Sequence, residues 1–349
     1  MSPHSIQTLL VTGANGYAAG HIIKLALEKS YNVRGTVRNK ASKAKLEDTF
    51  SQYTSQFSVH IVEDIMKPEL YETALDSSVT GVIHTASPFA FEIDDKVRDM
   101  LEPAIKGSVA ILEAVRCYGS SVRRVVTTSS FAAILDPTQA FRPGYTYTEK
   151  DWCPLTYEAG VSADWGAVTY IVSKALSEKA MWDWIKAENP SFSHVVINPP
   201  YIFGPHVPPL ASVENLNQST FQLWSMIDAE KIPATDFAAF VDVRDVAKIH
   251  IAAFETLEAG GHRFLLGKHF DYQSAADVAR EAIPELRHRM PEGTPGAGWE
   301  EAKNIYEVDG SKAEKMLGII YTPLSKSIED SFRELLDAEK DRKVQAITD

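Results

Sequence analysis

Tyr170 and Lys174 stand four residues apart in a stretch whose apolar spacing predicts a helix. Residues at this spacing lie on one helix face, about one turn apart. A phenol titrates near pH 10 in water, and a neighbouring ammonium group lowers its pKa by stabilising the anion. The pair therefore predicts a tyrosine that acts as a general acid with support from a lysine. A solvated helix face is the alternative, because Tyr-x-x-x-Lys is common by chance.

A serine at the end of a predicted strand supplies a third polar group. The β-branched run 122–130 ends in Thr127-Thr128-Ser129-Ser130, and ligands bind at the carboxyl ends of strands in open α/β sheets. The hydroxyl of Ser130 could hydrogen-bond a substrate oxygen and stabilise the oxyanion that develops on it.

A glycine-rich turn near the start of the chain predicts a dinucleotide site. The apolar run 8–12 leads into Gly13-Ala14-Asn15-Gly16-Tyr17-Ala18-Ala19-Gly20 and then into apolar residues at helical spacing. Gly13 can adopt the backbone angles of the turn, Gly16 has no Cβ to block a pyrophosphate, and the helix start presents unpaired N–H groups. An ordinary glycine-rich turn is the alternative. Combined with Ser130, Tyr170 and Lys174 in this order, however, the turn indicates a nicotinamide enzyme, with Lys174 also able to bond the nicotinamide ribose.

The second predicted strand, 31–38, indicates which nicotinamide cofactor binds. Folds that prefer NAD place an Asp or Glu about 20 residues after the glycines, but none occurs between Glu28 and Glu47. The region instead supplies four basic residues: Arg38, Lys40, Lys43 and Lys45. A guanidinium can bind a 2′-phosphate through two hydrogen bonds, so NADP(H) is favoured. The alternative for at least two of the four is a solvated helix face.

Strands alternate with helices over the first two thirds of the chain. Further strands are expected at 57–62, 81–87 and 194–198, and helices at about 94–118, with a kink at Pro103, and from a cap at Ser162 or Asp164 to Ile185. This alternation predicts a Rossmann-type, doubly wound parallel sheet over residues 1–198.

Three of these strands end where a cofactor would lie. Asp64 is expected near the adenine, and Thr85, Ala86 and Ser87 near the middle of the cofactor. His84 lies within an apolar strand, so it is interpreted as a buried structural histidine.

The pattern changes after Pro199-Pro200, where prolines and short elements replace the regular alternation. Residues 199–349 are expected to form a smaller α/β substrate-binding lobe, with segments around 240–260 able to pack back on the first domain. Residues 145–160 are interpreted as a loop, and 325–342 as an amphipathic closing helix.

Composition excludes several classes of partner. The net charge of −12, from 35 Lys+Arg against 47 Asp+Glu, argues against nucleic acid and against an anionic membrane surface. No apolar run approaches the roughly 20 residues of a membrane span, and residues 1–12 lack the features of a signal peptide. Cys117 and Cys153 show no metal-type spacing, so we expect no metal site, two cysteines that fill space, and a cytoplasmic protein. A monomer and a homodimer are equally compatible with the sequence.

The sequence resembles the extended short-chain dehydrogenase/reductase superfamily, within the dihydroflavonol-reductase-like group, and is most similar to yeast and fungal aldehyde or methylglyoxal reductases. The segments that carry the resemblance are 11–17, 33–38, 127–130, 170–174, 198–205 and 240–246. The resemblance implies that Ser130, Tyr170 and Lys174 are catalytic. It also implies contacts with NADPH from Asn15, Gly16, Tyr17, Ala18, Arg38, Asp64, Ile65, Thr85, Ala86, Ser87, Pro199 and Ile202, with Lys43 or Lys45 as a second phosphate contact.

Two positions depart from the plant flavonoid reductases of this group. The positions of the Asn and Gln that hold flavonoid hydroxyls are Leu135 and Ala239 here, so a flavonoid substrate is not expected. The pocket is expected to be apolar, and the side chains proposed to line it are Phe89, Phe131, Leu135, Tyr201 and Trp224. Ordinary core aromatics are the alternative for about half of them.

The sequence therefore predicts an NADPH-dependent carbonyl reductase that converts a small aldehyde or ketone to an alcohol, with Tyr170 as proton donor. One alternative is an epimerase or dehydratase of the same branch that keeps and recycles NAD(P). Another is a non-catalytic protein that senses the NADP(H) ratio.

Overall fold

The computed structural model describes residues 7–88 and 93–348 of the chain. These residues form two compact units. The first contains residues up to 138 together with 149–198 and 247–264, and the second contains 139–148, 199–246 and the chain from 265 onward. Each unit is described by itself below. The sequence-based assignment of the second part to substrate binding stays a prediction.

A seven-stranded sheet with the order β10-β7-β5-β4-β1-β2-β3 organises the first unit. The pairs β3–β2, β2–β1, β1–β4, β4–β5 and β5–β7 are all parallel. The strands are β1 (Thr8–Thr12), β2 (Asn32–Val37), β3 (Phe57–Ile61), β4 (Val79–His84), β5 (Arg124–Thr128), β7 (Ser193–Asn198) and β10 (Arg263–Leu265). Their carboxyl ends share one edge of the sheet, so the residues that follow them are brought together.

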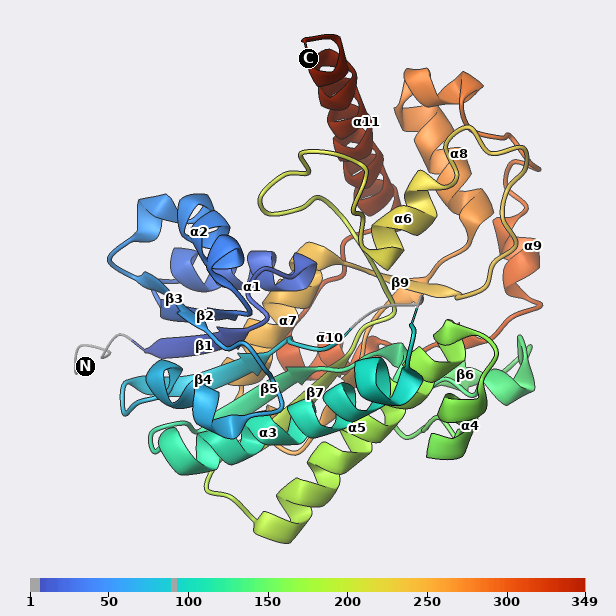
Figure 1. The fold of residues 1–349 in the computed structure, drawn as a ribbon. Helices are drawn as coiled ribbons and strands as arrows, with labels where there is room; N and C mark the ends of the chain where they lie inside the picture. Colours follow the sequence, from blue (N-terminus) through green and yellow to red (C-terminus); the bar gives the residue numbers. More distant parts are fainter. Residues whose placement is uncertain (1–6, 89–92, 349) are drawn as a thin grey trace. The chain divides into compact units, whose positions relative to one another are not determined.

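Helices cover both faces of this sheet, with α3 and α5 on one face and α1 and α7 on the other (Figure 1). The helices are α1 (Tyr17–Glu28), α2 (Lys40–Thr49), α3 (Glu102–Tyr118), α4 (Tyr157–Ser162), α5 (Gly166–Glu188) and α7 (Val243–Glu255). Short 3₁₀ helices span Ser51–Tyr53, Pro68–Ala74, Phe131–Ala133, Pro137–Gln139 and Leu257–Ala259. The doubly wound parallel fold predicted from the sequence is confirmed.

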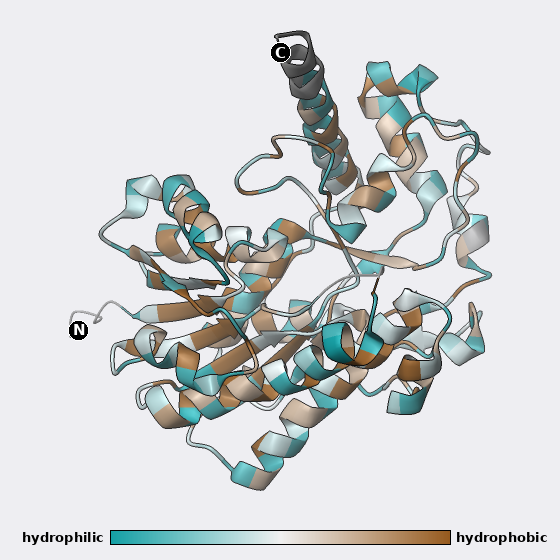
Figure 2. Ribbon diagram, viewed as in Figure 1, coloured by the Kyte–Doolittle hydropathy of each residue, from teal (hydrophilic) through white to brown (hydrophobic). Residues whose placement is uncertain are grey.

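The core of the first unit lies between the sheet and these helices. The strands are mostly hydrophobic, whereas the helices carry hydrophilic residues on their outer faces (Figure 2). Leu9, Leu10 and Val11 of β1 are fully buried, which is typical of a parallel strand covered on both faces. This burial explains why an apolar run, not an alternating pattern, marks β1.

The second unit has a three-stranded sheet, β11-β9-β8, and a two-stranded pair, β12-β6. The strands are β6 (Thr146–Tyr147), β8 (Tyr201–Phe203), β9 (Ala239–Asp242), β11 (Lys268–His269) and β12 (Glu307–Val308). The helices are α6 (Gln218–Trp224), α8 (Tyr272–Ala282), α9 (Gly298–Ala302), α10 (Ser311–Leu317) and α11 (Leu324–Thr348), with a 3₁₀ helix at Pro284–His288. Buried rings of Phe203, Phe240, Phe270 and Phe332 form much of its core.

Three sequence-based expectations about elements are wrong in detail. The predicted helix 94–118 begins at residue 96 and runs through a π-helical turn at Val97–Leu101 directly into α3, so Pro103 follows a π-helical segment inside one continuous helical run. The predicted loop 145–160 contains β6 and most of α4. The closing helix runs past residue 342, to Thr348.

The expected cap of α5 is also wrong. Helix α5 begins after Trp165 with no side-chain cap. Ser162 instead ends α4, where its hydroxyl donates to the carbonyl of Glu158 at 2.8 Å. A serine or aspartate before a predicted helix therefore indicates an N-cap only where that residue does not belong to a preceding helix.

Neither cysteine of the chain forms a disulfide, and Cys153 is buried as expected, whereas Cys117 is exposed and fills no space. Among the residues that the structure describes, no helix combines the length and the apolar character that crossing a bilayer requires.

Arg124 at the start of β5 connects the sheet to the end of α7. Its buried guanidinium donates to the carbonyl oxygens of Ala253 and Leu257, both at 2.8 Å. The carbonyl of Ala253 belongs to the last turn of α7, which leaves its acceptors without partners in the helix, whereas the carbonyl of Leu257 lies just beyond the helix and also accepts the N–H of Gly260 at 3.4 Å. We therefore expect Arg124→Met to lower the free energy of unfolding by about 3 kcal/mol, since several buried acceptors lose charged donors.

Chemical denaturation measures this loss. The matched control is Arg123→Met, which removes the neighbouring exposed arginine and should cost less than about 1 kcal/mol. Equal losses for the two variants would show that Arg124 does not anchor the end of α7.

Candidate active site

The turn between β1 and α1 forms an open cradle. Gly13 has a φ of 61°, and a Cβ on it would lie 2.8 Å from the Cα of Ala86. Gly16 occupies the N-cap position, and no side chain caps the first N–H groups of α1. Asn15, Tyr17 and Ala18 lie in the same turn and the first turn of the helix. The geometry fits a pyrophosphate, because the helix start offers N–H groups and positive potential without a competing side chain.

Hydrogen bonds to neighbouring strand ends hold the cradle in place. The hydroxyl of Thr85 donates to the carbonyl of Thr12 at 2.5 Å, and the N–H groups of Thr85 and Ala86 donate to the hydroxyl of Thr12, both at 3.2 Å. On the other side, the N–H of Ala14 donates to the carbonyl of Thr36 at 2.9 Å. Thr85 and Ala86, predicted at the middle of the cofactor, therefore lie beside the glycine turn.

The end of β2 carries the side chain predicted to select the cofactor. Arg38 is exposed, and within residues 7–88 and 93–348 its guanidinium has no hydrogen bond or ion pair. Asn39 caps α2 by accepting the N–H of Ser42 at 2.9 Å. Lys43 lies 3.7 Å from Glu47 of the same helix. Arg38 is thus a basic group at this strand end that is open to an anionic ligand.

Asp64 and Ile65 follow β3. A carboxylate oxygen of Asp64 accepts the N–H of Met66 at 2.9 Å, which closes a tight turn. The side chain of Ile65 packs so closely on Gly107 of α3 that a Cβ there would lie 2.8 Å from its Cδ1. Ile65 also lines the small cavity described below.

Ser130 follows β5 and starts the 3₁₀ helix Phe131–Ala133. Its hydroxyl accepts the N–H of Ala132 at 3.1 Å and is hydrogen-bonded to the side chain of Tyr170. Its carbonyl accepts the side-chain amide of Asn198 at 3.1 Å. The structure therefore brings together Ser130 and Tyr170, which are far apart in the sequence.

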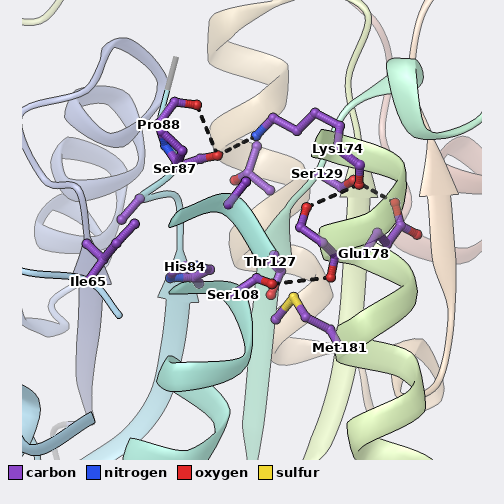
Figure 3. Close-up of a pocket in the computed structure, with 14 residues that line it drawn as sticks. Ile65, His84, Ser87, Pro88, Ser108, Thr127, Ser129, Lys174, Glu178 and Met181 are labelled. Carbon is purple, nitrogen blue, oxygen red and sulfur yellow. Dashed lines mark hydrogen bonds between the residues drawn. The ribbon is translucent and has the colours of Figure 1, made fainter. Parts of the chain in front are cut away.

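Helix α5 supplies Tyr170 and Lys174. The Nζ of Lys174 lies 5.7 Å from the centre of the Tyr170 ring and donates to the hydroxyl of Ser87 at 2.9 Å (Figure 3). Lys174 is buried. Because Ser87 follows β4, this bond connects the lysine to the strand end predicted to pass the cofactor.

Burial disfavours the charged forms of both groups. It raises the pKa of Tyr170 to about 12, and the hydrogen bond with Ser130 opposes this rise. Burial lowers the pKa of Lys174 to about 8, and the nearby carboxylate of Glu178 opposes this fall. The net pKa of Tyr170 is therefore raised and not lowered, because desolvation outweighs the groups that stabilise its anion.

A cavity of about 20 Å³ lies beneath Lys174, enough for one water molecule. The polar side chains that line it include His84, Ser108, Thr127 and Ser129 (Figure 3). The Nδ1 of His84 lies 2.8 Å from the hydroxyl of Thr12. Because that hydroxyl already accepts two N–H groups, it donates to His84, whose own proton therefore resides on Nε2. His84 is buried, as the sequence predicts.

The residues predicted to line a substrate pocket are divided between the two units. Phe131 is fully buried and Leu135 nearly so, both in the first unit. Tyr201 and Trp224 pack against the core of the second unit, where Pro199 and Ile202 also lie. Phe89 lies outside the described residues. The substrate pocket therefore stays a prediction.

Three residues of the site were missed by the sequence analysis. Glu178 lines the cavity one turn after Lys174, and Asn198 and Arg263 both donate to its carboxylate. The spacing of Tyr170, Lys174 and Glu178 could have indicated Glu178, because all three share one helix face. Asn198 and Arg263 belong to other strands, so no local pattern pointed to them. In the described part of the chain, no group of three or more His, Cys, Asp or Glu residues could hold a metal ion.

The sheet, the glycine cradle and the Ser-Tyr-Lys cluster define a dinucleotide-dependent enzyme of the Rossmann type. The sequence profile of the NAD dependent epimerase/dehydratase family matches residues 9–267. The chain therefore belongs to this family.

The chain is similar to several reductases. The chain is 34% identical over 342 residues to the NADPH-dependent methylglyoxal reductase GRE2 of Saccharomyces cerevisiae, covering 95% of this chain and 99% of the relative. It is 34% identical over 339 residues to the ketoreductase azaE of Aspergillus niger, covering 94% and 97%. The crystal structure of yeast methylglyoxal/isovaleraldehyde reductase Gre2 with NADPH superposes with a TM-score of 0.88 at 33% identity, covering 95% and 98%.

Because His84 is neutral in the folded protein, the free energy of unfolding should depend on pH. Burial and the Lys174 charge lower its pKa to about 3, from 6.5 for an ordinary histidine. Below pH 6.5 the unfolded chain binds a proton at His84 that the folded protein does not bind. The free energy of unfolding therefore falls as the pH falls from 6.5 toward 3. We expect His84→Gln to reduce the pH dependence of the unfolding free energy in this window by about 1.4 kcal/mol per pH unit.

Denaturant titrations between pH 7.5 and 4.5 measure this slope. The matched control is His288→Gln, because His288 is exposed and its replacement should leave the slope unchanged. A wild-type slope in the His84 variant would mean that this histidine is not kept neutral by the fold.

Proposed function

We propose that this protein is an NADPH-dependent carbonyl reductase that converts an aldehyde or ketone to an alcohol, with Tyr170 as proton donor. The observation that carries the proposal is the meeting of Ser130, Tyr170 and Lys174 at the carboxyl edge of the sheet, next to the glycine cradle. The names of the relatives, NADPH-dependent methylglyoxal reductase and ketoreductase, support the same reaction class.

The chain's own residues fit NADPH. Gly13, Gly16 and the start of α1 would hold the pyrophosphate, and Arg38 would bind the 2′-phosphate, with Lys43 nearby. Asp64 and Ile65 would border the adenine side, and Thr85, Ala86 and Ser87 the middle. Pro199 and Ile202, which belong to the second unit, are proposed contacts on the nicotinamide side. When bound, the reduced nicotinamide supplies the hydride.

Tyr170 and Ser130 act on the carbonyl oxygen. Because burial raises the pKa of Tyr170 to about 12, the phenol stays protonated at neutral pH and is ready to donate. Negative charge develops on the substrate oxygen as its carbon is reduced, and the phenol proton moves to that oxygen. The hydroxyl of Ser130 orients the same oxygen by a hydrogen bond.

Lys174 supports the phenolate that remains after the transfer. Its ammonium lies on the same face of α5 as the phenol, so a positive charge faces the new negative charge. The hydroxyl of Ser87 holds the ammonium in this position at 2.9 Å. Lys174 would also hydrogen-bond the nicotinamide ribose, which couples cofactor position to the proton donor.

The substrate is proposed to be a small carbonyl compound with hydrophobic substituents. Leu135, where flavonoid reductases of this group have Asn, is buried and apolar, so a polyhydroxylated substrate would lose a partner for its hydroxyls. Phe131, Tyr201 and Trp224 remain candidates for the pocket wall.

The absence of an acidic residue at the end of β2 favours an NADPH-dependent reductase over an epimerase that retains NAD. We also propose that the protein acts in the cytoplasm.

Removal of the phenol hydroxyl tests the proton donor. We expect Tyr170→Phe to lower the rate of NADPH consumption with a carbonyl substrate by about 100-fold or more, because no other group donates the proton. NADPH affinity, measured by fluorescence titration, should change little. Tyr118→Phe on α3 is the control and should keep wild-type turnover. Turnover of Tyr170→Phe near the wild-type rate would remove Tyr170 from the mechanism.

Charge reversal at Arg38 tests cofactor selection separately. Arg38→Glu should weaken NADPH binding by about 100-fold, since two charge-assisted hydrogen bonds are lost and a repulsion is added. NADH binding should change by less than about threefold, because NADH lacks the 2′-phosphate. Lys186→Glu, an exposed charge reversal in the last turn of α5, is the matched control. Equal weakening of NADPH and NADH by Arg38→Glu would contradict the assignment.

A further inference from the structure

Glu178 is a buried carboxylate on the catalytic face of α5. It lies one turn after Lys174 and two turns after Tyr170, and its side chain is about 1% exposed. An acidic side chain is rarely so buried unless other groups satisfy it. Glu178 also lines the cavity under Lys174 (Figure 3), so its hydrogen-bond partners indicate which groups of the site it positions.

One carboxylate oxygen of Glu178 contacts the segment that carries Ser130. The Oε2 atom accepts the hydroxyl of Ser129 at 2.6 Å and the side-chain amide of Asn198 at 2.7 Å. The same amide donates to the carbonyl of Ser130 at 3.1 Å. Glu178 therefore contacts the residue before Ser130 directly and reaches Ser130 itself through Asn198. Both contacts fix the backbone from which the Ser130 hydroxyl projects.

The other oxygen is held by a salt bridge. The Oε1 atom accepts the Nε of Arg263 at 2.5 Å and the indole N–H of Trp182 at 3.4 Å. Arg263 is itself buried and stacks on the ring of Trp152 at 3.6 Å. These partners satisfy the carboxylate away from water, where charges interact with little screening.

Lys174 is the titratable group on which this charge acts. Burial lowers the pKa of Lys174 to about 8, and Glu178 raises it. The other groups that face Lys174 cannot replace the carboxylate. Tyr170 is a neutral phenol, Ser87 of the strand end is a neutral hydroxyl, and His84 of β4 is neutral with a pKa of about 3. His194 of β7 is also neutral, because burial lowers its pKa to about 3.

We propose that Glu178 is a positioning residue of the reductase: it keeps the Lys174 ammonium charged at neutral pH and, through Ser129 and Asn198, fixes the Ser130 segment against α5. The inference rests on the proposed function, because Glu178 supports Lys174 and Ser130, the two residues next to the proton donor Tyr170. Glu178 itself touches neither substrate nor cofactor. Its effect is expected in the pH dependence of the site more than in a complete loss of activity.

The test is the pH profile of Glu178→Gln. The amide keeps the size of the side chain and one acceptor for Ser129 but removes the charge. Without the carboxylate the pKa of Lys174 falls further, so the alkaline decline of kcat/KM should move to lower pH by about one unit. The alkaline weakening of NADPH binding, followed by fluorescence without turnover, should shift in the same direction because Lys174 is proposed to hold the ribose.

Two further variants keep the test decisive. Glu178→Gln leaves Arg263 as a buried charge without its carboxylate and can fail to fold. The double variant Glu178→Gln with Arg263→Gln removes both charges of the buried pair, and both profiles should shift in the same direction but by less, because a positive charge that lowers the pKa of Lys174 is lost as well. Glu188→Gln is the matched control: it neutralises an exposed carboxylate at the end of the same helix, which pairs with Arg116, and should leave both profiles unchanged.

The outcomes separate this inference from the proposed function. Wild-type pH profiles in a folded Glu178→Gln protein, or in the double variant, would overturn the role of Glu178 while leaving the reductase intact. Failure of the wild-type protein to reduce any carbonyl compound would contradict the proposed function. In that case the pH dependence of NADPH binding still tests whether Glu178 controls the charge of Lys174.

Discussion

The site depends on keeping a lysine ammonium charged inside the protein, next to a neutral phenol. Burial acts against this state, since it lowers the pKa of Lys174 and would leave the phenolate of Tyr170 unsupported. The fold offsets this effect of burial with the carboxylate of Glu178 on the same helix face. The hydroxyl groups of Ser87 and Ser130, at two strand ends, bond Lys174 and Tyr170. A parallel sheet makes this possible, because the ends of β4, β5 and β7 bring Ser87, Ser130 and Asn198 to one edge.

The parallel sheet was predictable because its strands are buried on both faces. Apolar runs in the sequence coincide with β1 and β7, which are buried along most of their length, and the glycine turn follows β1 as expected. Features set by neighbouring segments were less visible. The start of α5 has no side-chain cap, so no local signal marks it, and α4 lies where the sequence shows only aromatic and turn-forming residues. The sequence also did not reveal that the second unit includes residues 139–148.

The chemistry of the site was predictable where it depends on spacing within one element or at a strand end. Tyr170 and Lys174 are neighbours on one helix, and Ser130 ends a β-branched run, so local patterns were sufficient. The network around Glu178 was not predictable, because its salt-bridge partner Arg263 lies 85 residues away in the sequence. The pKa of Tyr170 was misjudged for a related reason: desolvation depends on the whole surrounding fold, whereas sequence spacing reveals only the nearest charge.

The most direct test of the central claim is the consumption of NADPH, followed by its near-ultraviolet absorbance, with a panel of carbonyl compounds. The panel runs from methylglyoxal through aryl ketones and β-keto esters to a dihydroflavonol, with NADH as the control cofactor. We predict turnover that is specific for NADPH, for at least one class of aldehyde or ketone with hydrophobic substituents, and none with the dihydroflavonol. No turnover across the panel with NADPH binding intact would contradict the account, as would a purified protein that carries tightly held NAD.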